Sequence, residues 1–153
     1  MTETWFYHLE RRTSEEVLPE LLERTLARGW RALVCCDSAE RAAVLDTLLW
    51  TYREDSFLPH ACAGDGGASD QPILISAEME LTNQPHVLFL VGGVMPVWDR
   101  PELAGLSRIV LLFDGSDSAM ISAARAAWKA AGAAGHAVTY WRQNTAGKWQ
   151  KQA

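Results

Sequence analysis

Apolar residues along this chain follow two spacings, one typical of helices and one typical of buried strands. The helical spacing of three and four residues recurs in segments that begin near residues 13, 39 and 118. Between them lie short, nearly continuous apolar runs, the pattern of strands buried on both faces. These runs predict strands at 4–9, 30–36, 71–76, 86–91, 108–113 and 137–143.

The first predicted helix carries a start and a stop signal. Thr13-Ser14-Glu15-Glu16 is a capping-box pattern, and Gly29 is a suitable residue for the C-terminal end. Pro19 interrupts the pattern, so the helix is expected to bend there or to start later. The apolar face of this helix comprises Val17, Leu18, Leu21, Leu22 and Leu26.

The other two helices have comparable boundaries. Asp37-Ser38 caps a second helix over about Ala39 to Tyr52, and Asp114-Gly115-Ser116-Asp117 turns the chain into a third, Ala-rich helix. The third is expected to run to about Ala134, with Gly135 as its stop.

Helices that alternate with short apolar strands predict an α/β fold, with a mainly parallel, doubly wound, Rossmann-like sheet flanked by helices. A chain of 153 residues fits one domain. The sequence shows neither an internal repeat nor a long linker. We therefore expect a single domain over 1–153, in which about 144–153 form a polar C-terminal tail.

Composition places this domain away from membranes. The chain is 48% hydrophobic, but no window approaches the roughly 18 uncharged apolar residues of a membrane span. The N-terminal apolar run precedes its charges, which is the reverse of a signal peptide. Cys35 and Cys36 are adjacent on a predicted strand and point to opposite faces, which favours buried thiols over a zinc site or a disulfide. A cytoplasmic location is expected.

Charge is unevenly distributed along the chain. Residues 118–153 contain no Asp or Glu and five Lys or Arg, whereas residues 1–117 hold nine basic residues against all 19 acidic ones. The basic end is also aromatic, with Trp128, Tyr140, Trp141 and Trp149 among its cations. Cations mixed with large rings indicate a recognition surface for an acidic ligand.

Motifs for catalysis or cofactor binding are weak. Gly64-Asp65-Gly66-Gly67 lacks the Lys and Ser/Thr of a phosphate loop, so a plain loop is favoured. Asp114 after an apolar strand resembles a magnesium-binding Asp, but turn and cap chemistry is the commoner use of such a sequence. The four histidines show no metal-ligand spacing, and no nucleophile elbow is present. No catalytic residue, metal site or cofactor is predicted.

One face of the third predicted helix is a candidate binding surface. Arg125, Trp128 and Lys129 stand at i, i+3 and i+4, within one helical turn. The alternative is a solvated face whose cations favour the helix C-terminal half. Five cations provide poorly for nonspecific nucleic-acid binding, which depends on many phosphate contacts. A short acidic peptide with one anchor side chain fits better.

A second candidate surface lies where the second helix ends. Trp50 and Tyr52 precede a loop that contains Phe57, Leu58 and Pro59. These residues could cap the core, but apolar bulk in a loop is also where an interface anchor is found.

Taken together, these stretches resemble the chi subunit family of bacterial DNA polymerase III. The matching residues extend over the whole chain and are Leu49-Trp50, Ser56-Phe57-Leu58-Pro59-His60, Leu112-Phe113-Asp114-Gly115, Ala124-Arg125, Trp128-Lys129, Gly135, Tyr140-Trp141 and Gly147-Lys148-Trp149. The resemblance implies an α/β fold similar to a helicase motor domain without its nucleotide site. Trp128 and His136 occupy positions that are often Tyr and an aromatic residue in relatives.

The resemblance also implies a noncatalytic role and two protein partners. One is the psi subunit of the clamp loader, which would contact Trp50, Phe57 and Pro59. The other is the acidic C-terminal tail of single-stranded DNA-binding protein (SSB), so that DNA is reached only indirectly. The residues implied for the SSB tail are Arg125, Trp128, Lys129, Gly135, His136 and Tyr140.

Two other classes of function stay open. The basic aromatic end could bind single-stranded DNA directly, through stacking of bases on its rings. Alternatively, Asp37 and Asp114 could belong to a degenerate nucleotide-binding enzyme domain. Binding to bare oligonucleotide favours the first, and binding of ATP favours the second.

Overall fold

The apolar runs form one eight-stranded sheet in a computed structural model, which describes all residues except 1, 11, 52–57, 64–69 and 153. The strand order is β3-β4-β2-β5-β6-β1-β7-β8, and every neighbouring pair is parallel except β7 with β8. The strands are β1 (Glu3–Leu9), β2 (Ala32–Cys35), β3 (Ala61–Cys62), β4 (Ile73–Ser76), β5 (Val87–Leu90), β6 (Arg108–Asp114), β7 (Ala137–Gln143) and β8 (Trp149–Lys151).

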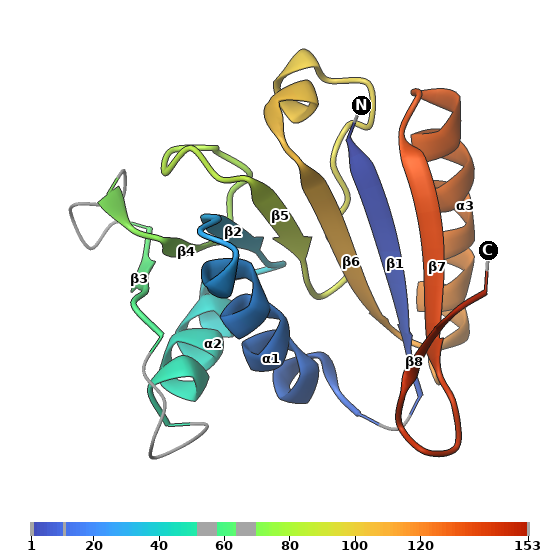
Figure 1. The fold of residues 1–153 in the computed structure, drawn as a ribbon, viewed down its shortest axis with the longest axis horizontal. Coiled ribbons are helices and arrows are strands. Elements are labelled where there is room, and N and C mark those ends of the chain that lie inside the picture. The colour runs from blue at the N-terminus through green and yellow to red at the C-terminus, as the bar shows by residue number, and fades with distance from the viewer. Residues whose placement is uncertain (1, 11, 52–57, 64–69, 153) are drawn as a thin grey trace.

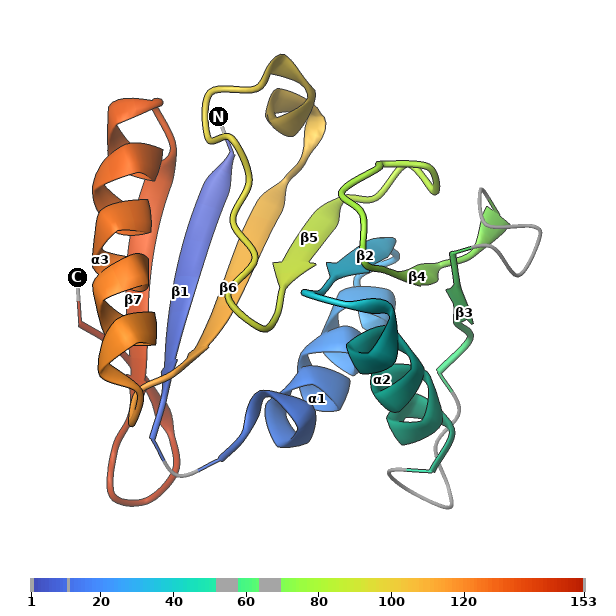
Figure 2. The same ribbon diagram turned by 180° about the vertical axis from the view of Figure 1, so that it is seen from behind.

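Helices cover both faces of this sheet, which confirms the predicted α/β class (Figures 1 and 2). Helices α1 (Ser14–Ala27) and α2 (Ala39–Thr51) pack on one face. Helix α3 (Ser118–Ala133) packs on the other face together with a 3₁₀ helix, Pro101–Gly105. Figure 1 shows that the near side of β1 and β7 carries none of the three α-helices, because α1 and α2 lie over the β2 and β5 side.

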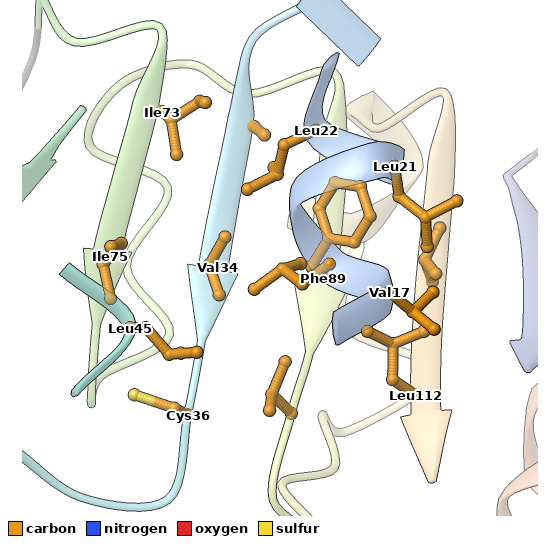
Figure 3. Close-up of a cluster of buried hydrophobic side chains, with 14 of the residues drawn as sticks. Val17, Leu21, Leu22, Val34, Cys36, Leu45, Ile73, Ile75, Phe89 and Leu112 are labelled. Atoms are coloured by element: carbon orange, nitrogen blue, oxygen red, sulfur yellow. The ribbon is translucent and has the colours of Figure 1, made fainter. Parts of the chain in front are cut away.

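Two apolar cores follow from the alternation of side chains along the strands. Val34, Phe89 and Leu112 point toward α1 and α2, where Figure 3 shows them beside Val17 and Leu21. The second core lies beneath α3 and contains Phe6, Leu33, Leu88, Leu111 and Phe113. Cys35 and Cys36 divide between the two cores, so both are buried and face opposite ways, as predicted.

The capping box of α1 is present, and the helix runs through Pro19. Thr13 Oγ1 accepts a bond from the backbone N–H of Glu16, and the Glu16 carboxylate accepts one from the Thr13 N–H. The helix begins at Ser14, so the alternative of a later start is wrong. Pro19 is buried in the second turn, where its missing N–H removes one helical hydrogen bond.

The C-terminal segment corrects a sequence prediction. Residues 144–153 are not a polar tail, because β8 pairs antiparallel with β7 through Trp141↔Lys151 and Gln143↔Trp149. Trp149 lies over Tyr7 with ring centroids 4.7 Å apart, and this contact anchors the hairpin to the core. Because polar residues stand on either side of Trp149, the apolar pattern of the sequence did not predict strand β8.

Candidate binding sites

Helix α3 displays the two cations predicted for ligand binding. Asp117 caps it, because its carboxylate accepts bonds from the N–H groups of Ala119 and Met120. The residues that α3 buries against the sheet are small, Ala124, Ala127 and Ala131, so Arg125 and Lys129 remain exposed on the outer side.

Trp128 lies between the exposed cations and the core. It is half-buried, and its ring centroid is 5.5 Å from that of Phe6 on β1 and 6.0 Å from that of Tyr140 on β7. The structure therefore places Trp128, one turn from Arg125 on α3, in contact with Tyr140 on β7. A ligand chain lying along α3 here would meet two cations and an aromatic edge.

A histidine that sequence reasoning did not assign supports Tyr140. His8 Nδ1 and the Tyr140 hydroxyl are hydrogen-bonded, and a Cβ at Gly115 would overlap the His8 ring. Burial lowers the pKa of His8, with a further lowering from the positive charges of Arg142 and Arg125, while Glu10 acts in the opposite direction. Burial raises the pKa of Tyr140, whereas the positive charges of Arg142 and Arg125 act to lower it.

We expect His8 to make folding stability depend on pH. Its pKa is lower in the folded chain than the ordinary value of 6.5, so the folded protein binds fewer protons than the unfolded chain. Stability from this group is complete above about pH 6.5 and is lost as the pH falls through the folded pKa. Urea unfolding of wild type and His8→Asn between pH 8 and pH 5 measures the effect, and a wild-type slope equal to that of the variant would contradict it.

Gly135 and His136, which the resemblance also implies for the SSB tail, lie at the C-terminal end of α3. Gly135 adopts a φ of +92°, which favours glycine, and closes the helix. His136 Nε2 donates to the Trp98 carbonyl oxygen at 2.9 Å, and Nδ1 accepts from the Thr4 hydroxyl at 3.0 Å. Both ring nitrogens of His136 are thus hydrogen-bonded within the protein.

Gly135 and His136 line a pocket of about 210 Å³ whose other wall comes from residues that sequence analysis did not assign. These are in the segment 98–104 and include Trp98 and Arg100, far from α3 in sequence. Sequence patterns gave no signal for this wall, because the segment has neither helical nor strand periodicity.

The second predicted surface is built on the end of α2. Trp50 is 54% exposed, and its ring lies 4.7 Å from that of His60. The His60 side chain is buried, with Nδ1 donating to the Leu58 carbonyl oxygen at 2.6 Å and Nε2 3.1 Å from Asp46 without hydrogen-bond geometry. Trp50 and Pro59 are therefore near each other around His60, whereas Phe57 lies outside the described residues.

The carboxyl edge of the sheet is where a nucleotide would bind in a doubly wound fold. A pocket of about 360 Å³ lies there, between the ends of β1 and β6. Its Arg41 is paired with Glu15 at 3.0 Å and with Asp37 at 2.6 Å. Asp114 accepts bonds from the N–H and hydroxyl of Ser116, which lower its pKa.

Asp37 thus pairs with Arg41 while Ser38 Oγ accepts the Arg41 N–H at the start of α2, and Asp114 stabilises a turn, which disfavours the nucleotide-binding alternative. The loop Gly64-Asp65-Gly66-Gly67 lies outside the described residues. Over the part of the chain that the structure describes, no three His, Cys, Asp or Glu side chains gather in a way that could hold a metal ion. In the same described ranges, no helix is both long enough and apolar enough to span a membrane.

The fold and this pocket together define a class of protein. It is a single-domain, doubly wound α/β protein in which the arginine at the switch-point pocket, Arg41, is already paired with Glu15 and Asp37. Comparison with known proteins then gives the family. The family model described as DNA polymerase III chi subunit, HolC, matches residues 1–139, and the chain belongs to this family.

Two curated relatives agree with this assignment. The DNA polymerase III subunit chi of Escherichia coli is 30% identical over 83 residues, which cover 50% of this chain and 56% of that protein. The probable DNA polymerase III subunit chi of Rickettsia prowazekii is 24% identical over 86 residues, which cover 56% of this chain and 52% of that protein. The chain thus spans about half the length of the curated relatives it matches.

Proposed function

We propose that this protein is a noncatalytic accessory subunit of DNA polymerase III in replication, acting in the cytoplasm as a bridge between psi and the SSB tail. The observation that carries this proposal is the exposed Arg125–Lys129 pair beside half-buried Trp128. It lies in a stretch, 118–153, without acidic residues. Family membership supplies the replication context.

The proposed binding of the acidic tail uses charge and an apolar anchor. Tail carboxylates pair with Arg125 and Lys129, and such charge-assisted bonds are stronger than neutral ones. Since α3 ends at Ala133, the pocket beside Gly135 lies within two turns of Lys129. Its roughly 210 Å³ offers a place for one terminal aromatic side chain.

The proposed contact with psi uses the other end of the sheet. Trp50 projects from α2 with 54% of its surface exposed, an unusual amount for so large an apolar residue. Aromatic anchors of this kind contribute most of the binding energy in many interfaces. Pro59 and Phe57 would complete this contact. Because α2 and α3 lie on opposite faces of the sheet, both partners can be held at once (Figures 1 and 2).

Affinity capture from bacterial lysate with two single variants tests the bridge. Trp50→Ala is expected to lose psi and keep SSB, whereas Lys129→Ala is expected to lose SSB and keep psi. Both side chains are exposed, so neither change should alter the fold. Loss of the same partner from both variants, or of neither, would refute two separate surfaces.

A further inference from the structure

The open face of the sheet, opposite α3, carries a row of aromatic and guanidinium groups. Arg108 lies over the Trp5 ring at 3.6 Å and within 5.4 Å of the Trp30 ring, and Arg28 lies over Trp30 at 4.4 Å. Beyond Trp5 the row continues through Trp141, Tyr7 and Trp149. The centroids of neighbouring rings in this part of the row are 4.7 to 6.3 Å apart. The row crosses β1, β7 and β8, where Figure 1 shows no covering α-helix among those described.

A groove of about 220 Å³ lies between α1 and the sheet, and of this row it is lined by Trp30, Trp5 and Tyr7 together with Arg28 and Arg108. Val87, Phe89 and Val110 supply its apolar floor, and the three arginines Arg24, Arg28 and Arg108 lie on its walls. None of the described residues that line it is acidic. Arg108 pairs with Glu3 at 3.1 Å, whereas Arg24 in the last turn of α1 and Arg28 at its C-cap are exposed.

The charges of this groove act on its aromatic wall. Burial raises the pKa of Tyr7 to about 12, and the positive charges of Arg108 and Arg24 oppose that rise. Tyr7, Arg24 and Arg108 line the same groove. Cations and rings alternate from Arg28 through Trp30 and Arg108 to Trp5. Trp30 also stacks on His86, with ring centroids 6.2 Å apart, and Trp5 is held by Trp141.

Ligand chemistry follows from this alternation. An acidic peptide supplies negative charge but no ring in each unit, whereas single-stranded nucleic acid supplies a flat base and a phosphate in every nucleotide. Bases stack on aromatic and guanidinium planes without regard to sequence. At about 220 Å³ the groove is smaller than the roughly 300–1,000 Å³ of a typical small-molecule site, so it has room for one base of a strand rather than a whole cofactor, and successive phosphates of that strand would reach the arginines on its walls.

We propose that the Trp5–Trp30 groove, with Arg24, Arg28 and Arg108, binds single-stranded nucleic acid directly. This site is separate from the proposed SSB-tail surface, because Tyr140 faces α3 while its neighbour Trp141 faces the groove side. Three cations on a chain of net charge −5 make the binding weak and nonspecific, with a dissociation constant on the order of 10⁻⁴–10⁻⁶ M. The single-stranded nucleic acid would bind in this groove while the SSB tail binds the separate α3 surface, so the two ligands would not compete.

Fluorescence anisotropy with a labelled oligothymidylate of about 12 nucleotides, within the roughly 4–16 that such platforms cover, tests this site. Three phosphate contacts predict a slope of about −2 for log affinity against log salt concentration, at about −0.7 per contact. Arg24→Ala with Arg28→Ala is expected to weaken binding at least about tenfold at low salt and to reduce the slope to about −0.7. The matched control, Arg125→Ala with Lys129→Ala on the opposite face, should leave both quantities unchanged.

Ring contacts are tested separately from charge. Trp30→Ala should weaken binding about fivefold or more, from stacking of roughly 1–3 kcal/mol per base, whereas Trp30→Phe should retain most of it. Absence of oligonucleotide binding at low salt, or equal loss in the control variant, would overturn the proposal. The proposal would also be overturned if thymidine monophosphate bound as tightly as the oligonucleotide. The same holds if an Asp-rich peptide bound more tightly than the oligonucleotide and displaced it.

Discussion

Replacing Arg125 and Lys129 together by alanine is expected to abolish measurable binding of a peptide that carries the acidic SSB tail. Each charge-assisted contact contributes about 1.5–3 kcal/mol, so each loss weakens binding by roughly tenfold or more. Both side chains are exposed on α3, and their removal leaves its buried alanines in place. Calorimetric titration of the peptide measures the effect, and the wild-type affinity should fall as salt is added.

The acid-free end offers a matched control for this pair. Lys148 and Lys151 carry the same formal charge but lie on or beside the β7–β8 hairpin. Lys148→Ala with Lys151→Ala removes the same net charge from the protein and should leave most of the affinity. If both double variants weaken the peptide equally, general electrostatic attraction and not the α3 surface accounts for binding.

Phe6→Ala is expected to cost about 3–5 kcal/mol of unfolding free energy, a large part of the stability of an ordinary domain. Phe6 is fully buried under α3, and its ring contacts Trp128 at 5.5 Å and Trp98 at 6.3 Å between centroids. The resulting cavity would remove the support of Trp128 and of one wall of the pocket at Gly135.

Urea denaturation and peptide titration together test this coupling. Phe6→Leu keeps most of the apolar volume and should cost less than Phe6→Ala, since the cavity is smaller. At temperatures where both variants are folded, the alanine variant should bind the acidic peptide more weakly than the leucine variant. Equal affinities would show that Trp128 does not depend on Phe6 for its position.

Local signals predicted most of the fold. Strands such as β6 and β7 were found within a residue of their observed ends, because apolar runs buried on both faces have a pattern of their own. The capping residue Asp117 and the stop at Gly135 defined α3 for equally local reasons. Strand β8 could not be found this way. Trp149 is surrounded by polar residues, and its place in the sheet depends on pairing with β7 and on a contact with Tyr7, which is distant in sequence.

For the candidate surfaces, local spacing predicted positions on the fold, whereas their binding stays a prediction. Helical spacing placed Arg125, Trp128 and Lys129 on one face, and the structure agrees. The sequence did not divide Tyr140 from Trp141, which the alternation of β7 sends to opposite faces of the sheet. The cations of the Trp5–Trp30 groove were missed as well, because Arg24, Arg28 and Arg108 come from segments whose charge was counted with the acidic body.

The two edges of the sheet limit how this protein can join others. Strand β3 has two residues and β8 has three, so within the described chain neither edge offers a long row of unpaired backbone groups. Strand-by-strand extension of the sheet by another chain needs such a row, and short edges are a common protection against aggregation. The proposed contacts with psi and with the SSB tail rest instead on exposed side chains such as Trp50 and Lys129, so single substitutions should separate the two.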